Sequence, residues 1–177
     1  VPLILSQYQA LSIVIIDDSS PDGTGELADQ LALEYPGRIF VIHRTVRGRG
    51  TAGIDGFKFA LSKKPDLIIE MDADFSHNPK YIPEFIAEIQ KGYDVIIGSR
   101  FVPGGKIPHR SVFRNALSDI ANCYNQFFLN LQDIKDTSGG FKCYRREVLE
   151  KINLNDIIST GYSIGAELLY EIKQKGF

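Results

Sequence analysis

The stretch LIIEMDADFSHNP, residues 67–79, decides the fold, because a short apolar run ends in two aspartates that one alanine separates. The apolar run is continuous rather than alternating, which is typical of a strand buried on both faces of a parallel sheet. In open α/β sheets, ligands bind beyond the carboxyl ends of the strands. The position of Asp72 and Asp74 therefore predicts a binding site at this edge of a sheet.

Similar runs and helical segments alternate through the first half of the chain. Asn78 is expected to cap a helix that begins at Pro79. The alternation predicts an α/β fold with a doubly wound, mainly parallel sheet and helices on both faces, as in Rossmann-like nucleotide-binding domains. The predicted strands are LSIVIID (11–17), RIFVIH (38–43), DLIIEMD (66–72) and DVIIGS (94–99), and the predicted helices cover 25–35, 51–64 and 79–92.

The second half is predicted to contain one long helix, a short strand and two further helices. The long helix covers residues 111–133, and its apolar side chains recur on one face, which we expect to pack mainly on the sheet. The short strand lies around GGFKCY (139–144), and the last helices cover 145–152 and 164–175. Because no linker divides the chain, residues 1–177 are expected to form a single domain.

Composition excludes several classes of protein. A net charge of −2 gives no overall attraction for nucleic acid. The two cysteines, Cys123 and Cys143, do not indicate a disulfide framework or a zinc site, and we expect reduced thiols in a cytosolic protein. No apolar run reaches the roughly 18 residues that a transmembrane helix needs, and no signal peptide is expected at the start.

Two acidic clusters end two of the predicted strands. Asp17 and Asp18 end the first, and Asp72 and Asp74 end the third. Side chains alternate along an extended segment, so Asp72 and Asp74 are expected to point the same way and to repel each other unless a cation lies between them. Magnesium and manganese prefer such oxygen ligands. The alternative is that Asp72 begins a turn and Asp74 caps a helix.

A glycine-rich loop, RTVRGRGTAGIDG (44–56), precedes the second predicted helix. Gly48 and Gly50 at a helix start favour phosphate binding. The loop matches neither the P-loop pattern nor a dinucleotide-binding fingerprint. A plain connection is the alternative.

Six stretches, in this order, resemble the family-two nucleotide-sugar glycosyltransferases, which have a GT-A fold. Within that family they look most like polyprenol-phosphate (dolichol-phosphate) mannosyltransferases, and the DADFSHNP form is closer to these enzymes than to their glucosyl relatives. The resemblance covers nearly the whole chain. The stretches are IVIIDDSSPDGT, RGRGTAGIDGF, EMDADFSHNP, VIIGSRFVPGG, HRSVFRNALS and DTSGGFKCYRREVL.

The resemblance implies a donor site and a metal site. Asp74 matches the principal ligand of magnesium or manganese, and Ser76 stands where some relatives carry a metal-binding glutamine, so that its contact is expected to pass through water. The nucleotide-sugar donor would be bound by Ile16, Asp18, Asp72, Ala73, Asp74, Ser76 and Arg100.

The acceptor phosphate is expected to be bound by Arg100, Arg114 and Ser118. Arg114 and Ser118 are four residues apart and therefore share one helical face, where an arginine fork and a hydroxyl suit a phosphate. The alternative for Arg114 is a solvated surface charge. Asp74, Arg100 and Arg114 are the expected catalytic residues, with Asp136 as an active-site wall or an orienting residue rather than a base. His77 and His109 are expected to be structural.

The implied reaction is inverting, metal-dependent transfer of mannose from GDP-mannose to a polyprenyl (dolichyl) phosphate. An acceptor carried in a membrane predicts a peripheral protein on the cytoplasmic face, where the aromatic and basic residues of the long helix suit a bilayer surface. Two alternatives stay open. One is a transferase that uses UDP-glucose or another sugar with a lipid phosphate or a polysaccharide, and the other is a non-catalytic nucleotide-sugar-binding module.

Both ends of the chain depart from the family pattern. No P-x-Y-N-E-like segment precedes VPLIL, and relatives continue past ELLYEIKQKGF with a strand and a basic segment. The domain is therefore expected to lack the first strand and the C-terminal segment of the family.

Overall fold

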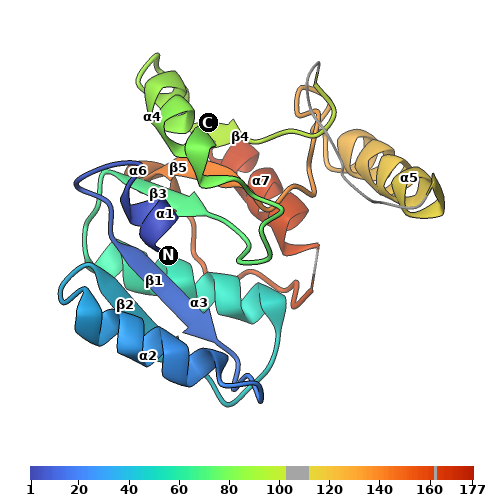
Figure 1. Cartoon of the computed structure of the whole chain (residues 1–177). Helices are drawn as coiled ribbons and strands as arrows, with labels where there is room; N and C mark the ends of the chain where they lie inside the picture. Colours follow the sequence, from blue (N-terminus) through green and yellow to red (C-terminus); the bar gives the residue numbers. More distant parts are fainter. Residues whose placement is uncertain (103–111, 162) are drawn as a thin grey trace.

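A computed structural model describes residues 1–102, 112–161 and 163–177, and for residues 112–119 it describes the backbone alone. The side chains of Arg114 and Ser118, and the whole of His109, lie outside the described part. The chain begins with α1 (Pro2–Leu5), and strands and helices then alternate as predicted. Figure 1 shows the arrangement.

The first sheet consists of two parallel strands with a helix after each. β1 (Ile13–Asp17) pairs with β2 (Ile39–His43), with Ile13 opposite Ile39 and Asp17 opposite His43. α2 (Thr24–Glu34) follows β1, and α3 (Arg49–Ser62) follows β2. The parallel register brings the carboxyl ends of both strands to one edge, as the sequence predicts for a binding site.

The second sheet has three strands in the order β3-β5-β4. β5 (Lys142–Arg145) lies between β3 (Leu67–Glu70) and β4 (Val95–Ile97) and runs antiparallel to both, so β3 and β4 run in the same direction. The α/β class is confirmed, with an antiparallel strand in the middle of this sheet. The predicted strand 66–72 is too long, because β3 ends at Glu70 and Asp72 lies in the following turn.

Helices cover both faces of the second sheet. Cys143 of β5 packs in one hydrophobic cluster with Ile82 and Phe85, while the next residue, Tyr144, packs in the other with Phe57 and Leu168. Successive side chains of a strand point to opposite faces, so β5 is buried on both. The covering elements are α4 (Ile82–Ile89) on one face and α3, α6 (Arg146–Glu150) and α7 (Ile164–Gln174) on the other. The short 3-10 helix η1 (Pro79–Tyr81) precedes α4, and the Asn78 side chain accepts from Lys80 N as the predicted cap.

The long helix α5 (Val112–Phe128) extends away from the rest of the domain (Figure 1). Its polar side chains face the protein: Asn122 accepts from Thr137 N at 2.9 Å, and Gln126 donates to the Ile134 carbonyl at 2.7 Å. The predicted helix 111–133 is too long, and Leu131 of the predicted stripe lies beyond its end at Phe128 and is buried. Within α5, the expectation that the apolar stripe packs on the sheet is wrong for the described side chains. Four are exposed, namely Ile120 (66%), Tyr124 (59%), Phe127 (72%) and Phe128 (64%).

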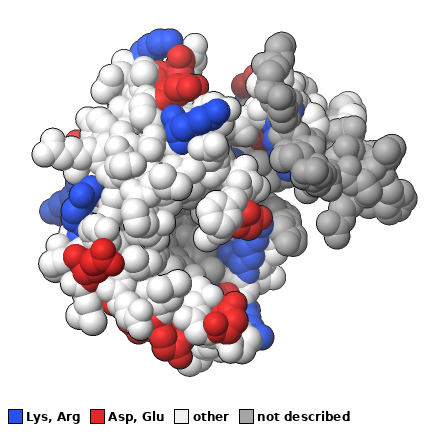
Figure 2. Space-filling view, in the orientation of Figure 1, with Lys and Arg blue, Asp and Glu red and all other residues white. Residues whose placement is uncertain are grey.

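The charges on one face of the protein are mixed in sign, and the two cysteines are not paired with each other. On the face that Figure 2 shows, acidic and basic side chains are scattered and neither sign forms a continuous patch. Cys123 is exposed, Cys143 is buried, and both are free thiols. Within the described ranges, no helix has the length and apolar character needed to cross a bilayer.

Candidate active site

The acidic end of β1 holds the glycine-rich loop. The Asp18 carboxylate accepts from Gly48 N at 2.8 Å and from the Arg44 guanidinium. Gly50 N donates to the Thr160 carbonyl at 3.0 Å, and a Cβ at Gly50 would lie 2.7 Å from the Thr160 carbonyl carbon. Only glycine fits at that distance, so the loop is held in place on both sides.

Asp72 is held by two groups that the sequence analysis did not connect to it. Arg49 Nη2 donates to both of its carboxylate oxygens, at 2.7 and 2.9 Å. The backbone N–H of Asp72 donates to Nδ1 of His77 at 2.8 Å, and the His77 ring stacks on Phe141. The expectation that His77 is structural is confirmed, since its ring fixes the turn that carries Asp72.

Asp74 and Ser76 form the exposed tip of the same turn. Asp74 Oδ1 accepts from Ser76 N at 3.0 Å, and hydrogen bonding by the Ser76 side chain and then by its backbone lowers the pKa of Asp74 below its usual value. Phe75 between them has a φ of 63°, which a tight turn requires here. The alternation argument for Asp72 and Asp74 therefore does not apply. The alternative that Asp74 caps a helix is not observed either, because Asp74 accepts from Ser76 within the turn and Asn78 is the N-cap of the following helix.

Arg100 forms a fork with Asp136. Nε and Nη2 of Arg100 donate to the two carboxylate oxygens at 2.9 and 3.0 Å, and Nη2 also donates to the Ser138 hydroxyl at 3.0 Å. The Asp136 carboxylate is 0% exposed. Burial alone would raise the pKa of Asp136, but hydrogen bonds from Arg100 and its charge outweigh burial and lower it. Asp136 thus orients Arg100, as expected.

The segment 136–140 joins these two groups. A Cβ at Gly140 would lie 2.9 Å from Arg49 Nη2 and 3.3 Å from Asp72 Oδ2, so this backbone packs directly against the Arg49–Asp72 pair. The same segment carries Asp136 and hence Arg100. Two arginines and two aspartates from four distant parts of the sequence are thereby collected at one edge of the domain.

The remaining expected site residues have fewer described contacts. Ile16 lies on β1, and a Cβ at Gly56 of α3 would touch its side chain at 3.4 Å. Ala73 is exposed in the turn after β3. Arg114 and Ser118 lie on the backbone of α5, and their contacts are outside the described part of the chain.

Comparison with known proteins identifies the family. The sequence model of glycosyl transferase family 2 matches residues 3–153 of the chain. The chain belongs to glycosyl transferase family 2. It is therefore a glycosyltransferase, as its resemblance to the polyprenol-phosphate mannosyltransferases implied.

Two curated members of the family are similar to almost all of this chain. Polyprenol monophosphomannose synthase of Mycolicibacterium smegmatis is 41% identical over 181 residues, covering 99% of this chain and 68% of that protein. Dolichol-phosphate mannosyltransferase of Pyrococcus furiosus is 41% identical over 166 residues, covering 93% of this chain and 44% of that protein. The chain thus spans about two thirds of the first protein and less than half of the second.

Comparison with solved structures confirms the GT-A fold. Glucosyl-3-phosphoglycerate synthase of Mycobacterium tuberculosis, in complex with Mn²⁺ and UDP-glucose, has a TM-score of 0.53 and 19% identity. The likeness covers 88% of this chain and 51% of that one. At this identity the comparison establishes the fold alone.

The turn 72–76 has the donor chemistry that a hard divalent cation needs. The Asp74 carboxylate is exposed and its lowered pKa keeps it ionised at neutral pH, and the Ser76 hydroxyl lies two residues away. Magnesium usually binds one or two carboxylates and completes its coordination with phosphate oxygens and water. No group of three or more metal-binding side chains occurs in the described ranges, so the protein would supply only part of the ligand set.

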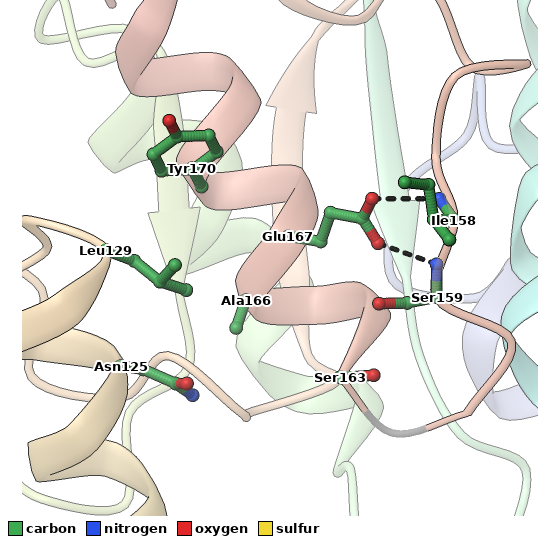
Figure 3. Close-up of a pocket in the computed structure, with 8 residues that line it drawn as sticks. All are labelled: Asn125, Leu129, Ile158, Ser159, Ser163, Ala166, Glu167 and Tyr170. Carbon is green, nitrogen blue, oxygen red and sulfur yellow. Dashed lines mark hydrogen bonds between the residues drawn. The ribbon is translucent and has the colours of Figure 1, made fainter.

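A cavity lies between α5 and α7, apart from the candidate site residues described above. Glu167 accepts from the backbone N–H groups of Ile158 and Ser159, both at 2.8 Å, and thereby fixes one wall (Figure 3). Other lining residues are Asn125, Leu129, Ser163, Ala166 and Tyr170.

Arg49 and Lys142 are the residues that the sequence analysis missed. Arg49 lies in the quoted loop, but nothing local indicates that it meets Asp72, 23 residues later. Lys142 had a signal, since a lysine within the apolar strand around GGFKCY is unusual.

Proposed function

We propose that the chain is the catalytic domain of a polyprenol-phosphate mannosyltransferase, which transfers mannose from GDP-mannose to a polyprenyl phosphate with inversion at the anomeric carbon. The observation that carries this proposal is the 41% identity to polyprenol monophosphomannose synthase over 99% of this chain. The similarity to a dolichol-phosphate mannosyltransferase supports the same acceptor class.

The donor would bind along the edge formed by the ends of β1 and β3. Asp18 fixes the loop at Gly48, and Asp72 is fixed by Arg49, so both carboxylates are already in place before a ligand binds. Preorganised groups avoid an ordering cost on binding. In this proposal Asp18 and the Ile16 backbone contact the nucleoside, while Asp72 and Ala73 line the ribose and diphosphate.

Asp74, assisted by Ser76 through water, would hold magnesium or manganese against the diphosphate. When bound, such a cation supplies positive charge that offsets the charge developing on the leaving diphosphate. The structural neighbour described with Mn²⁺ and UDP-glucose supports a divalent ion for this fold in general.

The acceptor step needs charge compensation more than it needs a base. The phosphate oxygen of the acceptor is anionic near neutral pH, so no proton has to be removed before it attacks. As that oxygen bonds to the anomeric carbon, the bond from this carbon to the donor diphosphate breaks, and GDP leaves with the bonding electrons. Arg100, oriented by Asp136, and Arg114, with Ser118, would offset the repulsion between the two anionic reactants. Attack from the face opposite the leaving group gives the β-linked product.

The proposal places the protein at the cytoplasmic face of a membrane, and the exposed face of α5 supports contact with a bilayer surface. Tyr124 and Phe127 both contact Phe128, with ring centroids 4.5 and 5.1 Å apart, so the aromatic side chains form one outward-facing group. Helices with such a face lie in the interface of a bilayer. A lipid-borne acceptor would be presented at the same surface.

A donor and acceptor screen tests the proposal. The chain is incubated with Mn²⁺, a short-chain polyprenyl phosphate and either GDP-mannose or UDP-glucose, and the products are analysed by mass spectrometry. We expect one hexose to be added from GDP-mannose, and none when the acceptor is the polyprenol without phosphate. Transfer from UDP-glucose alone would support the alternative transferase, and donor binding without any product would support a binding module.

A further inference from the structure

Lys142 carries a charged group into the interior of the domain. Its side chain lies on β5, is 1% exposed, and stands opposite Glu70 of β3 in the antiparallel register. Lysine is almost never fully buried unless it is paired. The position therefore requires specific partners inside the fold.

The groups around the Lys142 ammonium come from the segment before β5, from β3 and from α7. The Lys142 ammonium donates to the carbonyl oxygen of Gly139, and a Cβ at Gly165 would lie 3.1 Å from it. Burial lowers the pKa of Lys142, while the charges of Glu70, Asp136 and Asp72 oppose that change. Glu70 Oε2 in turn accepts from the Tyr144 hydroxyl at 3.2 Å.

Each of these partners leads directly to the candidate site. Glu70 is the last residue of β3 and stands two residues before Asp72. Gly139 precedes Gly140, whose backbone packs on the Arg49–Asp72 pair, and follows Asp136, which orients Arg100. The buried Lys142 ammonium thus lies beside both β3, which leads to Asp72 of the proposed donor site, and the segment 136–140, which orients Arg100 of the proposed acceptor site.

We infer that Lys142 is a positioning residue for glycosyl transfer, whose ammonium holds the segment 136–140 against β3 so that Arg100 and Asp72 keep their relative places. The inference rests on the proposed function for its link to transfer. Stability alone does not explain the residue, because apolar side chains that replace buried charged groups are often neutral or stabilising. Misplacement of reacting groups, in contrast, costs large factors in rate.

The test compares four variants of the full chain, of which Lys142→Met is the simplest. Glu70→Gln/Lys142→Met removes both buried charges together and leaves an amide oxygen for the Tyr144 hydroxyl, so it keeps the test valid if Lys142→Met alone does not fold. Lys142→Arg keeps the charge. Leu149→Ala is the control, because Leu149 is 0% exposed in the core on α6 and has no part in the segment 136–140.

Three measurements are made at a temperature where each variant is folded: hydrogen exchange of the 136–141 peptide, binding of GDP with Mn²⁺, and kcat and KM for mannosyl transfer. We expect the double variant to lose about tenfold or more in kcat, which is the scale of a misplaced reacting group. Exchange of its 136–141 peptide should be faster than in the wild type. Lys142→Arg should retain more kcat than Lys142→Met, and Leu149→Ala should show neither change.

A double variant with wild-type kcat, or an equal loss of kcat in Leu149→Ala, would overturn the inference. If the wild-type chain transfers no mannose, the proposed function fails separately. Hydrogen exchange and GDP–Mn²⁺ binding then decide the role of Lys142, and unchanged exchange in the double variant would reject it.

Discussion

A single nitrogen of Arg49, Nη2, donates to both carboxylate oxygens of Asp72, at 2.7 and 2.9 Å. The contact joins the first turn of α3 to the turn after β3 and places Gly140 against both residues. It gives Asp72 a fixed place and a partner of opposite charge. A carboxylate beside an incoming diphosphate would otherwise repel it.

Replacing Arg49 should therefore weaken donor binding. For Arg49→Met we expect KM for the donor to rise by about tenfold, which corresponds to roughly 1.4 kcal/mol of lost interaction with a partly exposed charged group. Arg47→Met is the matched control, because Arg47 lies in the same loop, has the same charge and donates to the exposed Ser19 carbonyl. Steady-state kinetics measure both variants, and equal KM values for the two would contradict the assignment.

Asp136 should make the free energy of unfolding decrease as the pH falls into the acidic range. Its pKa in the folded protein lies below the unfolded value, so the stabilisation is present above the unfolded pKa and disappears as pH falls through the folded pKa. Asp136→Asn should lower the free energy of unfolding at pH 7 by on the order of 3 kcal/mol, because it leaves the Arg100 charge without its partner.

Urea unfolding between pH 7 and pH 3 measures this effect. The wild type should lose stability towards acid more steeply than Asp136→Asn. Parallel curves for the two proteins would show that the Arg100–Asp136 pair does not govern acid stability.

His43 should titrate above its usual range. Hydrogen bonds to Asp29 at 2.9 Å and to Asp17 at 3.4 Å raise its pKa above the model-peptide value of about 6.5. The stability it contributes is present below the unfolded pKa and is lost as pH rises through the folded pKa. An NMR titration should give a raised pKa in the wild type and a lower one in Asp29→Asn, and identical titrations would contradict the contact.

The outward-facing aromatic group of α5 should bind lipid. Burial of one phenylalanine side chain contributes about 1.5–3 kcal/mol, so Phe127→Ser/Phe128→Ser should weaken binding to vesicles by at least ~10-fold. Leu33→Ser is the control, because Leu33 is 83% exposed on α2, away from α5. Vesicle sedimentation measures both, and an equal loss in the control would contradict a role specific to α5.

Local sequence patterns predicted most of the helices and strands, because the spacing of apolar residues depends on which faces of a segment are buried. The continuous apolar runs gave β1 to β4 within two residues at each end, and Asn78 with Pro79 marked the start of η1. The stripe on α5 was identified correctly, but periodicity shows only that a face is apolar and not what covers it. Asn122 and Gln126 bind the segment 134–137, and these contacts turn the apolar face outward.

Candidate site residues could be named from the sequence where a motif contains them, but their contact partners could not be named where two distant segments meet. Asp18, Asp72, Asp74 and Arg100 stand in stretches that resemble the family. The partners that hold them, Arg49 and Asp136 above all, lie 23 and 36 residues away, and such pairings depend on tertiary structure. Both residues stand in stretches quoted for the resemblance, but nothing local indicated that Arg49 contacts Asp72 or that Asp136 contacts Arg100.

The most direct measurement is calorimetric titration of GDP-mannose into the chain with and without Mn²⁺, for the wild type, Asp74→Asn and the control Asp156→Asn, followed by transfer to a polyprenyl phosphate. The wild type and Asp156→Asn should bind the donor more tightly with Mn²⁺ than without it, and both should form mannosyl lipid. Asp74→Asn should remain folded, but Mn²⁺ should not increase its donor affinity and it should form no product. Full transfer by Asp74→Asn, or donor binding in the wild type that Mn²⁺ does not change, would contradict the account.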